Sequence, residues 1–224
     1  MDNLDVRVGN FILFMVALIF SGSVHEALHA WTSSHFGDDL ARSQGRVSLN
    51  PLVHVDPFGT LLFPAVSFFT GAPMLGWARA TPTNPMRWRN KNVANFWVSI
   101  AGILGNLFLA IVAGVALRVM YETGYLERAG FGNDGDMAVG VVKLVSIFFV
   151  LNVSLAVFNF LPIPPLDGIH ILESLLPDSY APAFETVNQY GMILLFIVLL
   201  TGFLNPIFAV VLPFAQRLIF LGAS

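Results

Sequence analysis

The chain has no cysteine and little charge for its 224 residues. Without cysteine it can form neither a disulfide framework nor a metal site with thiolate ligands. Only 11% of the residues are charged and 56% are apolar, whereas soluble domains carry roughly 25% charged and about 45–50% apolar residues. So little charge, together with 21 phenylalanines, cannot cover a surface that faces water. The composition therefore indicates a protein of the lipid bilayer.

Two further absences limit the function and the domain organisation. The net charge is only −3 and no run of basic residues is suited to nucleic acid, so we expect no nucleic-acid partner. No polar stretch is long enough for a separate soluble module, so residues 1–224 are expected to form a single domain. The first apolar run lacks the basic flank and cleavage site of a signal peptide, and we expect it to be retained.

Four apolar segments have about the length of a transmembrane helix, roughly 20 residues. They cover residues 8–31, 95–120, 139–160 and 190–212. The last contains Asn205-Pro206, where a kink or break is expected. A fifth stretch, residues 59–77, is shorter and is interrupted by two prolines and two glycines. It either crosses the membrane or enters and returns as a re-entrant segment.

Basic residues flank this fifth stretch on both sides. They are Arg42 and Arg46 before it, and Arg79, Arg87, Arg89 and Lys91 after it. Cytoplasmic loops of membrane proteins carry an excess of Lys and Arg, so both flanks are expected in the cytoplasm. This favours a re-entrant segment and an N-terminus on the outside, although Arg7 favours the opposite orientation.

Residues 42–50, RSQGRVSLN, mix β-branched and polar residues between turn signals, which predicts a short strand or hairpin near the membrane surface. Residues 76–83 are a second candidate of the same kind. The glycine-rich residues 122–136 are expected to form an exposed loop. The predicted fold is an all-α polytopic membrane protein. It has about four to six transmembrane or re-entrant segments and a short membrane-associated β-hairpin.

The first apolar segment ends in His25-Glu26-Ala27-Leu28-His29, a match to H-E-x-x-H. Residues four apart lie on one face of a helix, so both imidazoles can bind one metal ion. Glu26 lies about 100° further round the helix, where it can accept a proton from water while zinc polarises the scissile carbonyl. The alternative is a hydrogen-bonded structural cluster. Ionisable residues in an apolar helix are costly, however, unless they face a partner or a wet cavity.

A catalytic zinc ion has three protein ligands and a water. Without cysteine, the third ligand must be His, Asp or Glu, and the candidates are His35, His54, Asp56, Asp167, His170 and Glu173. Asp167 follows a segment whose three prolines exclude a regular helix, so its carboxylate can project back toward the first helix. Alternatively, Asp167 caps the helix that follows it. The residues alone leave this choice open.

HEALH in a first membrane helix, with NFLPIPPLDG at residues 159–168, resembles the site-2 protease family of intramembrane metalloproteases. The segments GRVSLNPLVHVDPFGTLLFP and GWARATPTNP are similar to its compact branch, which lacks a PDZ domain. The resemblance covers about residues 21–171. It implies a zinc ion held by His25, His29 and Asp167, with Glu26 as general base. It also implies that Asn159 contacts the substrate or the oxyanion. The alternative is that Asn159 packs between helices.

The sequence departs from the family at two places. Ile169 stands where a second glycine commonly follows Asp-Gly, and Gly102-Ile103 stands where the family has Gly-Pro. Neither change removes a ligand. His54, at the predicted membrane edge, is a further candidate for substrate binding. His35 and His170 are expected to have structural roles. Gly102, Gly105 and Asn106 are spaced for close helix packing.

The sequence thus predicts a zinc endopeptidase that cuts peptide bonds in or near transmembrane segments, within a prokaryotic cell (inner) membrane. The family resemblance implies a transmembrane protein or a remnant signal peptide as substrate, and residues 42–50 are expected to hold it in extended form. The sequence specifies no oligomeric state. The alternatives are a noncatalytic scaffold and a membrane metal-ion transporter that uses the same cluster. A transporter needs polar residues along several helices, whereas the ionisable groups here cluster at one level.

Overall fold

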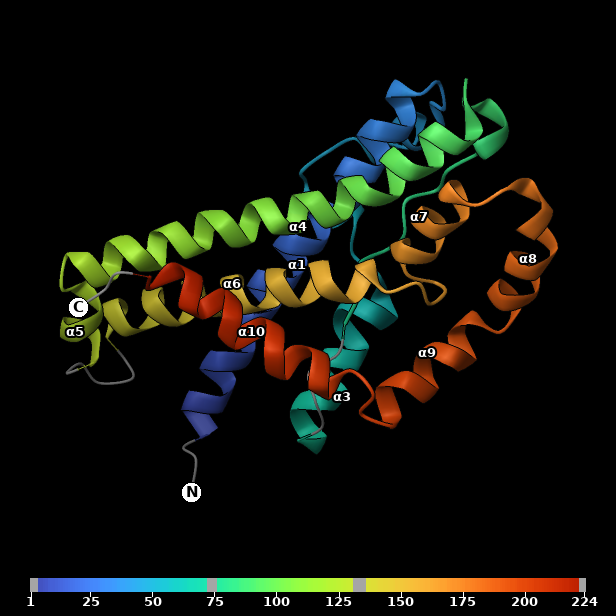
Figure 1. Ribbon diagram of the computed structural model, residues 1–224. Coiled ribbons are helices and arrows are strands. Elements are labelled where there is room, and N and C mark those ends of the chain that lie inside the picture. The colour runs from blue at the N-terminus through green and yellow to red at the C-terminus, as the bar shows by residue number, and fades with distance from the viewer. Residues whose placement is uncertain (1–3, 72–75, 131–135, 222–224) are drawn as a thin grey trace.

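The computed structural model describes residues 4–71, 76–130 and 136–221, and these residues form helices and connecting segments without β-strands. Three helices are long and apolar enough to cross a membrane, or four if a bent pair counts as one span. The three are α1 (Leu4–His35), α4 (Lys91–Glu122) and α6 (Met137–Phe160). They pack against one another, with α1 crossing the α4–α6 pair (Figure 1). These helices confirm the spans predicted at 8–31, 95–120 and 139–160.

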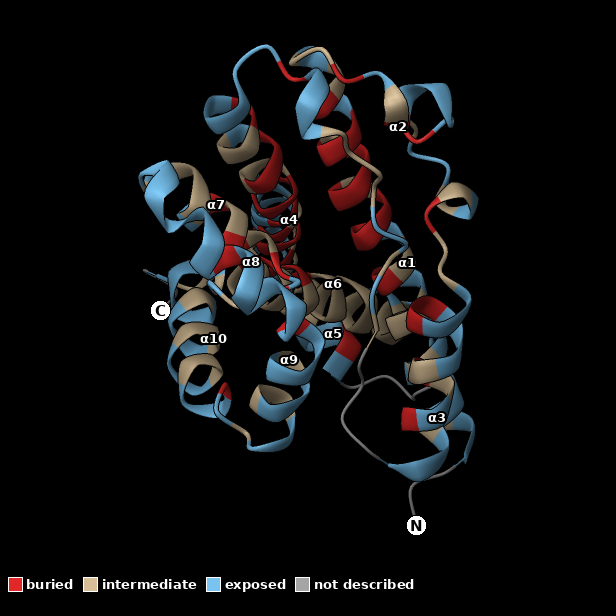
Figure 2. Ribbon diagram, turned by 90° about the vertical axis from the view of Figure 1, so that its right-hand side faces the viewer, coloured by how far each residue is buried: buried red, intermediate tan, exposed pale blue. Residues whose placement is uncertain are grey.

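Small residues line the surfaces where these helices meet. Buried positions of α1 include Ala17, Gly22 and Ala30, and α4 buries glycines and alanines along its length. Lipid tails are as apolar as leucine, so helices in a bilayer associate through close packing of small residues. Large side chains such as Phe108 and Ile111 are exposed, as a lipid-facing surface requires. Figure 2 shows the buried residues of α1 and α4 on the sides that face the bundle.

Among the described residues between α1 and α4 there are five short helices. They are α2 (Leu40–Ser43), η1 (Pro51–Val53), η2 (Pro57–Leu62), α3 (Phe63–Thr70) and η3 (Pro85–Arg87). The predicted re-entrant stretch, 59–77, includes residues 72–75, which lie outside the described residues. Its two ends lie together, because the N–H of Trp77 donates to the Gly59 carbonyl (3.1 Å) and Thr60 Oγ1 donates to the Trp77 carbonyl (2.8 Å). The two described ends of this stretch therefore lie side by side, and whether it spans or re-enters the membrane stays a prediction.

The predicted β-hairpin is wrong. Residues 42–50 begin in α2 and continue as turns, and residues 76–83 are extended where the structure describes them but pair with no strand there. The guanidinium of Arg46 donates to the carbonyls of Val53, Arg79 and Ala80, which occupies acceptors that a partner strand would need. The buried side chain of Arg46, rather than a β-ladder, therefore joins these segments.

The part of the chain after α4 also differs from its prediction. Besides α6, its described helices are α5 (Tyr125–Gly130), α7 (Asp167–Leu175), η4 (Asp178–Tyr180), α8 (Ala181–Gln189), α9 (Gly191–Leu200) and α10 (Asn205–Ile219). The single span predicted at 190–212 is broken at residues 201–204, where Gly202 has a φ of +68°. Pro206 lies in the first turn of α10, a position that proline favours. Helix α10 then packs back against α4 and α6. The loop predicted at 122–136 contains α5, and residues 131–135 lie outside the described residues.

A buried carboxylate fixes the connection between the end of α1 and the segment before α4. Asp38 is fully buried, and its oxygens accept hydrogen bonds from Ser33 Oγ (3.1 Å), the N–H of Leu40 (3.1 Å) and the N–H of Asn84 (2.6 Å). Two of these donors are backbone groups that would be left unpaired without the carboxylate.

We therefore expect Asp38→Ala to lower the free energy of unfolding by about 3 kcal/mol, because it leaves buried donors unsatisfied. The midpoint of thermal unfolding in detergent measures this effect. Asp39→Ala is the matched control, because the Asp39 side chain is 69% exposed, and its effect should stay within about 0.5 kcal/mol. Equal shifts for the two variants would contradict this role of Asp38.

Candidate metal centre

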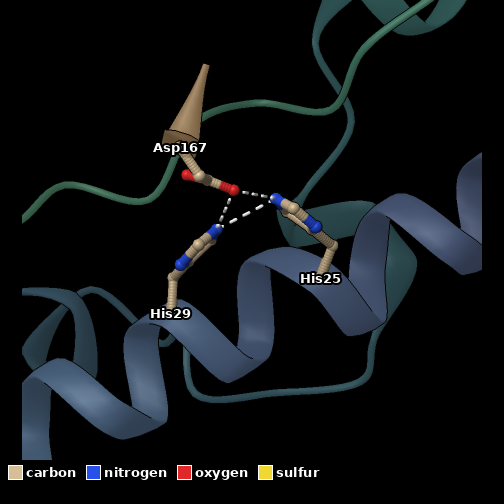
Figure 3. A group of neighbouring side chains, drawn as sticks. All are labelled: His25, His29 and Asp167. Carbon is tan, nitrogen blue, oxygen red and sulfur yellow. Dashed lines mark hydrogen bonds and ion pairs between the residues drawn. The ribbon is translucent and has the colours of Figure 1, made fainter. Parts of the chain in front are cut away.

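Three ligand atoms from distant parts of the chain meet inside the bundle (Figure 3). His25 Nε2 and His29 Nε2 are 2.9 Å apart, and Asp167 Oδ2 lies 3.2 Å from the first and 3.3 Å from the second. Tetrahedral zinc with bonds of about 2.0–2.2 Å places its ligand atoms about 3.3 Å apart. The three residues therefore form a group that can hold a metal ion, and their spacing fits zinc.

Asp167 reaches this group because the chain returns toward α1 after α6. The prolines between α6 and α7 prevent a continuous helix, and Gly168 allows the backbone to approach the carbonyls of Phe160 and Leu161. No side-chain hydrogen bond caps α7, whose N-cap residue is Leu166. Instead, Asp167 Oδ2 is buried at ion-pair distance from both imidazoles, and no hydrogen-bond partner for it is found in the part of the chain that the structure describes. Of the two roles that the sequence left open, this geometry favours ligand over cap.

The charge of Asp167 also suits a metal ligand. Burial of this carboxyl opposes ionisation, but the neighbouring imidazoles of His29 and His25 hold its pKa below the usual range. An ionised carboxylate offers the hard, negatively charged oxygen that a divalent cation binds.

The second nitrogen of each imidazole is fixed by an oxygen. His25 Nδ1 lies 2.7 Å from Asn106 Oδ1, and His29 Nδ1 lies 2.6 Å from the Val98 carbonyl. A carbonyl oxygen only accepts, so each Nδ1 carries a proton, and in the neutral imidazole that binds a metal the lone pair is then on Nε2, which faces the proposed metal position. From its spacing, Asn106 was expected to serve helix packing, and its contact with His25 was not predicted. Its one available signal was an amide in the middle of an apolar helix.

Glu26 lies beside the metal ligands without being one of the three. Its carboxylate accepts a hydrogen bond from the N–H of Thr81 (2.6 Å), and Thr81 Oγ1 donates to the Glu26 carbonyl (2.9 Å). The extended residues 77–83 therefore orient this carboxylate toward a cavity that it shares with His25, His29 and Asp167.

The cavity has a volume of about 950 Å³, enough for a short peptide segment. Its walls come mainly from α1, residues 76–83, the first half of α4, the end of α6, the start of α7 and α9. Asn159 lines it, with Nδ2 donating to the Leu155 carbonyl (3.0 Å). His170, expected to be structural, also lines the cavity and lies 3.4 Å from Glu173.

His54 is placed elsewhere. It is 2% exposed and is not among the residues that line the cavity. Its Nε2 lies 2.8 Å from the Ser48 carbonyl, and its own carbonyl accepts the N–H of Arg79. The structure therefore places Asn159, but not His54, on the wall of the cavity that holds His25, His29 and Asp167. His35 stacks on Trp31 at 6.0 Å.

Comparison with known proteins agrees with this geometry. The model of "Peptidase family M50" matches residues 13–201. The chain belongs to this family, which is the site-2 protease family. It is therefore a zinc metalloprotease. No solved structure matches it.

Bacterial relatives support this membership. "Putative zinc metalloprotease YwhC" of Bacillus subtilis is 38% identical over 198 residues, which cover 88% of this chain and 83% of the relative. "Putative zinc metalloprotease Rip2" of Mycolicibacterium smegmatis is 31% identical over 199 residues, covering 88% and 70% respectively. The "Putative zinc metalloprotease Rip2" of Mycobacterium tuberculosis strain H37Rv is 26% identical over 199 residues, which cover 88% of this chain and 70% of the relative.

Gly102 of this peptidase makes room for the two imidazoles. A Cβ atom at this position would lie 2.5 Å from His29 Nε2 and 2.6 Å from His25 Cε1. The glycine was expected to serve helix packing, but the groups that approach it here are the imidazoles of His25 and His29, which are candidate metal ligands.

Gly102→Ala should therefore displace the imidazoles and weaken zinc affinity by at least about tenfold, the scale of changes that disturb ligand orientation. Competition with a zinc chelator in detergent measures this affinity. Gly140→Ala in α6 is the control, because no atom lies within 4 Å of its added Cβ. Wild-type affinity in Gly102→Ala would show that the imidazoles do not need this space.

Proposed function

We propose that this protein is an intramembrane endopeptidase that hydrolyses peptide bonds in or near transmembrane segments of other membrane proteins. The observation that carries the proposal is one cavity, walled by membrane-spanning helices, that holds a candidate metal triad and a separately oriented carboxylate. The triad is His25, His29 and Asp167, and the carboxylate is Glu26.

The chemistry divides between the metal and the protein. Bound zinc lowers the pKa of water and polarises the scissile carbonyl. Glu26 accepts the proton of the attacking water and later delivers it to the leaving amine. The hydrogen bond from Thr81 holds the Glu26 carboxylate in one orientation for both transfers. The side-chain amide of Asn159, on the cavity wall, supplies a hydrogen bond to the oxyanion or to the unwound substrate backbone.

The extended segment beside Glu26 suits an unwound peptide. The N–H groups of Trp77, Arg79 and Thr81 donate to Gly59, His54 and Glu26 respectively. Successive N–H groups of an extended chain point to opposite sides, so those of the intervening alanines, Ala78 and Ala80, point away from these acceptors. Both alanines line the cavity. We infer that the substrate extends along residues 77–81 rather than along residues 42–50.

The substrate class follows from the position of the site. A cavity among membrane-spanning helices admits a transmembrane protein or a remnant signal peptide from the bilayer. The named relatives come from bacteria, which supports placement in a prokaryotic cell membrane. The metal triad forms one local site beside a positioned base, an arrangement that serves hydrolysis better than metal transport.

Glu26→Gln tests the proposal. The variant should keep its zinc but hydrolyse a model transmembrane substrate in detergent about 100- to 10,000-fold more slowly, because the amide cannot accept the water's proton. Glu173→Gln is the control, since Glu173 lines the same cavity and lies beside His170 but not beside the metal triad. It should cleave at close to the wild-type rate. Cleavage by Glu26→Gln at the wild-type rate, or by protein freed of metal with a chelator, would refute the proposed mechanism.

A further inference from the structure

Two asparagines are completely buried among the apolar helices. Asn106 lies on α4 and Asn152 on α6, and both are 0% exposed, as is Ser21 on α1. A polar side chain inside a membrane bundle is costly unless it is hydrogen-bonded, and its presence points to a function.

These side chains form a continuous path that begins and ends on α1. His25 Nδ1 lies 2.7 Å from Asn106 Oδ1, and Asn106 Nδ2 donates to Asn152 Oδ1 at 3.0 Å. Asn152 Nδ2 donates to Ser21 Oγ at 2.8 Å. Ser21 and His25 are four residues apart and so lie on one face of α1. The path therefore connects three helices and returns to α1 one turn from where it left.

The direction of every hydrogen bond in this path follows from one backbone carbonyl. Asn152 Nδ2 also donates to the Phe148 carbonyl at 2.8 Å, and this acceptor fixes the orientation of the Asn152 amide. Asn152 Oδ1 must then face Asn106 Nδ2, which leaves Asn106 Oδ1 to face His25. An acceptor at that place requires a proton on His25 Nδ1 and leaves Nε2 free.

We propose that Asn106 and Asn152 are positioning residues that select the metal-binding tautomer of His25 and hold its Nε2 toward the metal. This inference rests on the proposed role of His25 as a metal ligand. His29 gains the same tautomer from the backbone carbonyl of Val98. Of the two histidines, His25 therefore depends on a side chain that a mutation can remove, whereas His29 depends on the backbone.

Zinc affinity, measured by chelator competition in detergent, tests the inference. Asn106→Leu should weaken zinc affinity about 10- to 100-fold, the usual effect of removing a group that orients a metal ligand. Asn152→Leu should cause a smaller loss, although Asn152 does not touch His25. The double variant should bind zinc no more weakly than Asn106→Leu, because Asn152 acts through Asn106.

Two further variants separate positioning from packing. Val153→Ala removes a buried neighbour of Asn152 from the α4–α6 core and should leave zinc affinity unchanged. Asn106→Asp keeps an acceptor for His25 Nδ1–H and should recover most of the affinity lost in Asn106→Leu, whereas a packing role predicts no such recovery from a buried carboxylate. Because Asn106→Asp and Asn152→Leu are read independently, the test does not depend on the folding of Asn106→Leu.

The outcomes distinguish this inference from the proposed function. Zinc binding by wild type with additive losses in the double variant, or without recovery in Asn106→Asp, overturns the positioning role alone. Absence of zinc binding by wild type in the presence of excess metal overturns the proposed function, and this inference with it.

Discussion

Two imidazoles and a carboxylate meet within 3.3 Å of one another inside a bundle of otherwise apolar helices. In a medium of low dielectric constant, such groups persist only when each is paired or bound to a metal. Much of the surrounding structure supplies this pairing. His25 is held by an amide from α4, His29 by a backbone carbonyl of α4, and Glu26 by the backbone of the extended segment. Asp167 Oδ2 has no such partner, and a metal ion would satisfy it.

The fold brings these partners together by interrupting its own helices. The prolines after α6 and the close approach at Gly168 return the chain so that α7 begins beside α1. The buried guanidinium of Arg46 gathers the carbonyls of the loops between α1 and α4, which places Thr81 next to Glu26. Irregular backbone at this depth is tolerated because it is buried in protein or lines a cavity. The same irregularity supplies the extended segment on which the proposed unwinding of a substrate depends.

The sequence specified the parts of the site that depend on local spacing. H-E-x-x-H sets two histidines on one face of a helix, and the three long apolar runs became α1, α4 and α6. It left Asp167 between ligand and cap, because only the return of the chain after α6 decides which groups the carboxylate meets.

The β-hairpin was predicted wrongly because the Arg46 side chain satisfies carbonyls that a strand would have bonded. The segment at 190–212 was expected to kink or break at Asn205-Pro206, and the chain does break there, although the break begins a few residues earlier, at the left-handed turn of Gly202. Asn106 looked like a packing residue because its partners, His25 and Asn152, are distant in the sequence.

X-ray absorption at the zinc edge of the purified protein tests the central claim most directly, because it reports the atoms bound to the metal. The account predicts one zinc environment of nitrogen and oxygen ligands at about 2.0–2.2 Å, with the scattering pattern of two imidazoles. Protein that retains no zinc, or zinc without imidazole scattering, would contradict a metal centre built from His25, His29 and Asp167.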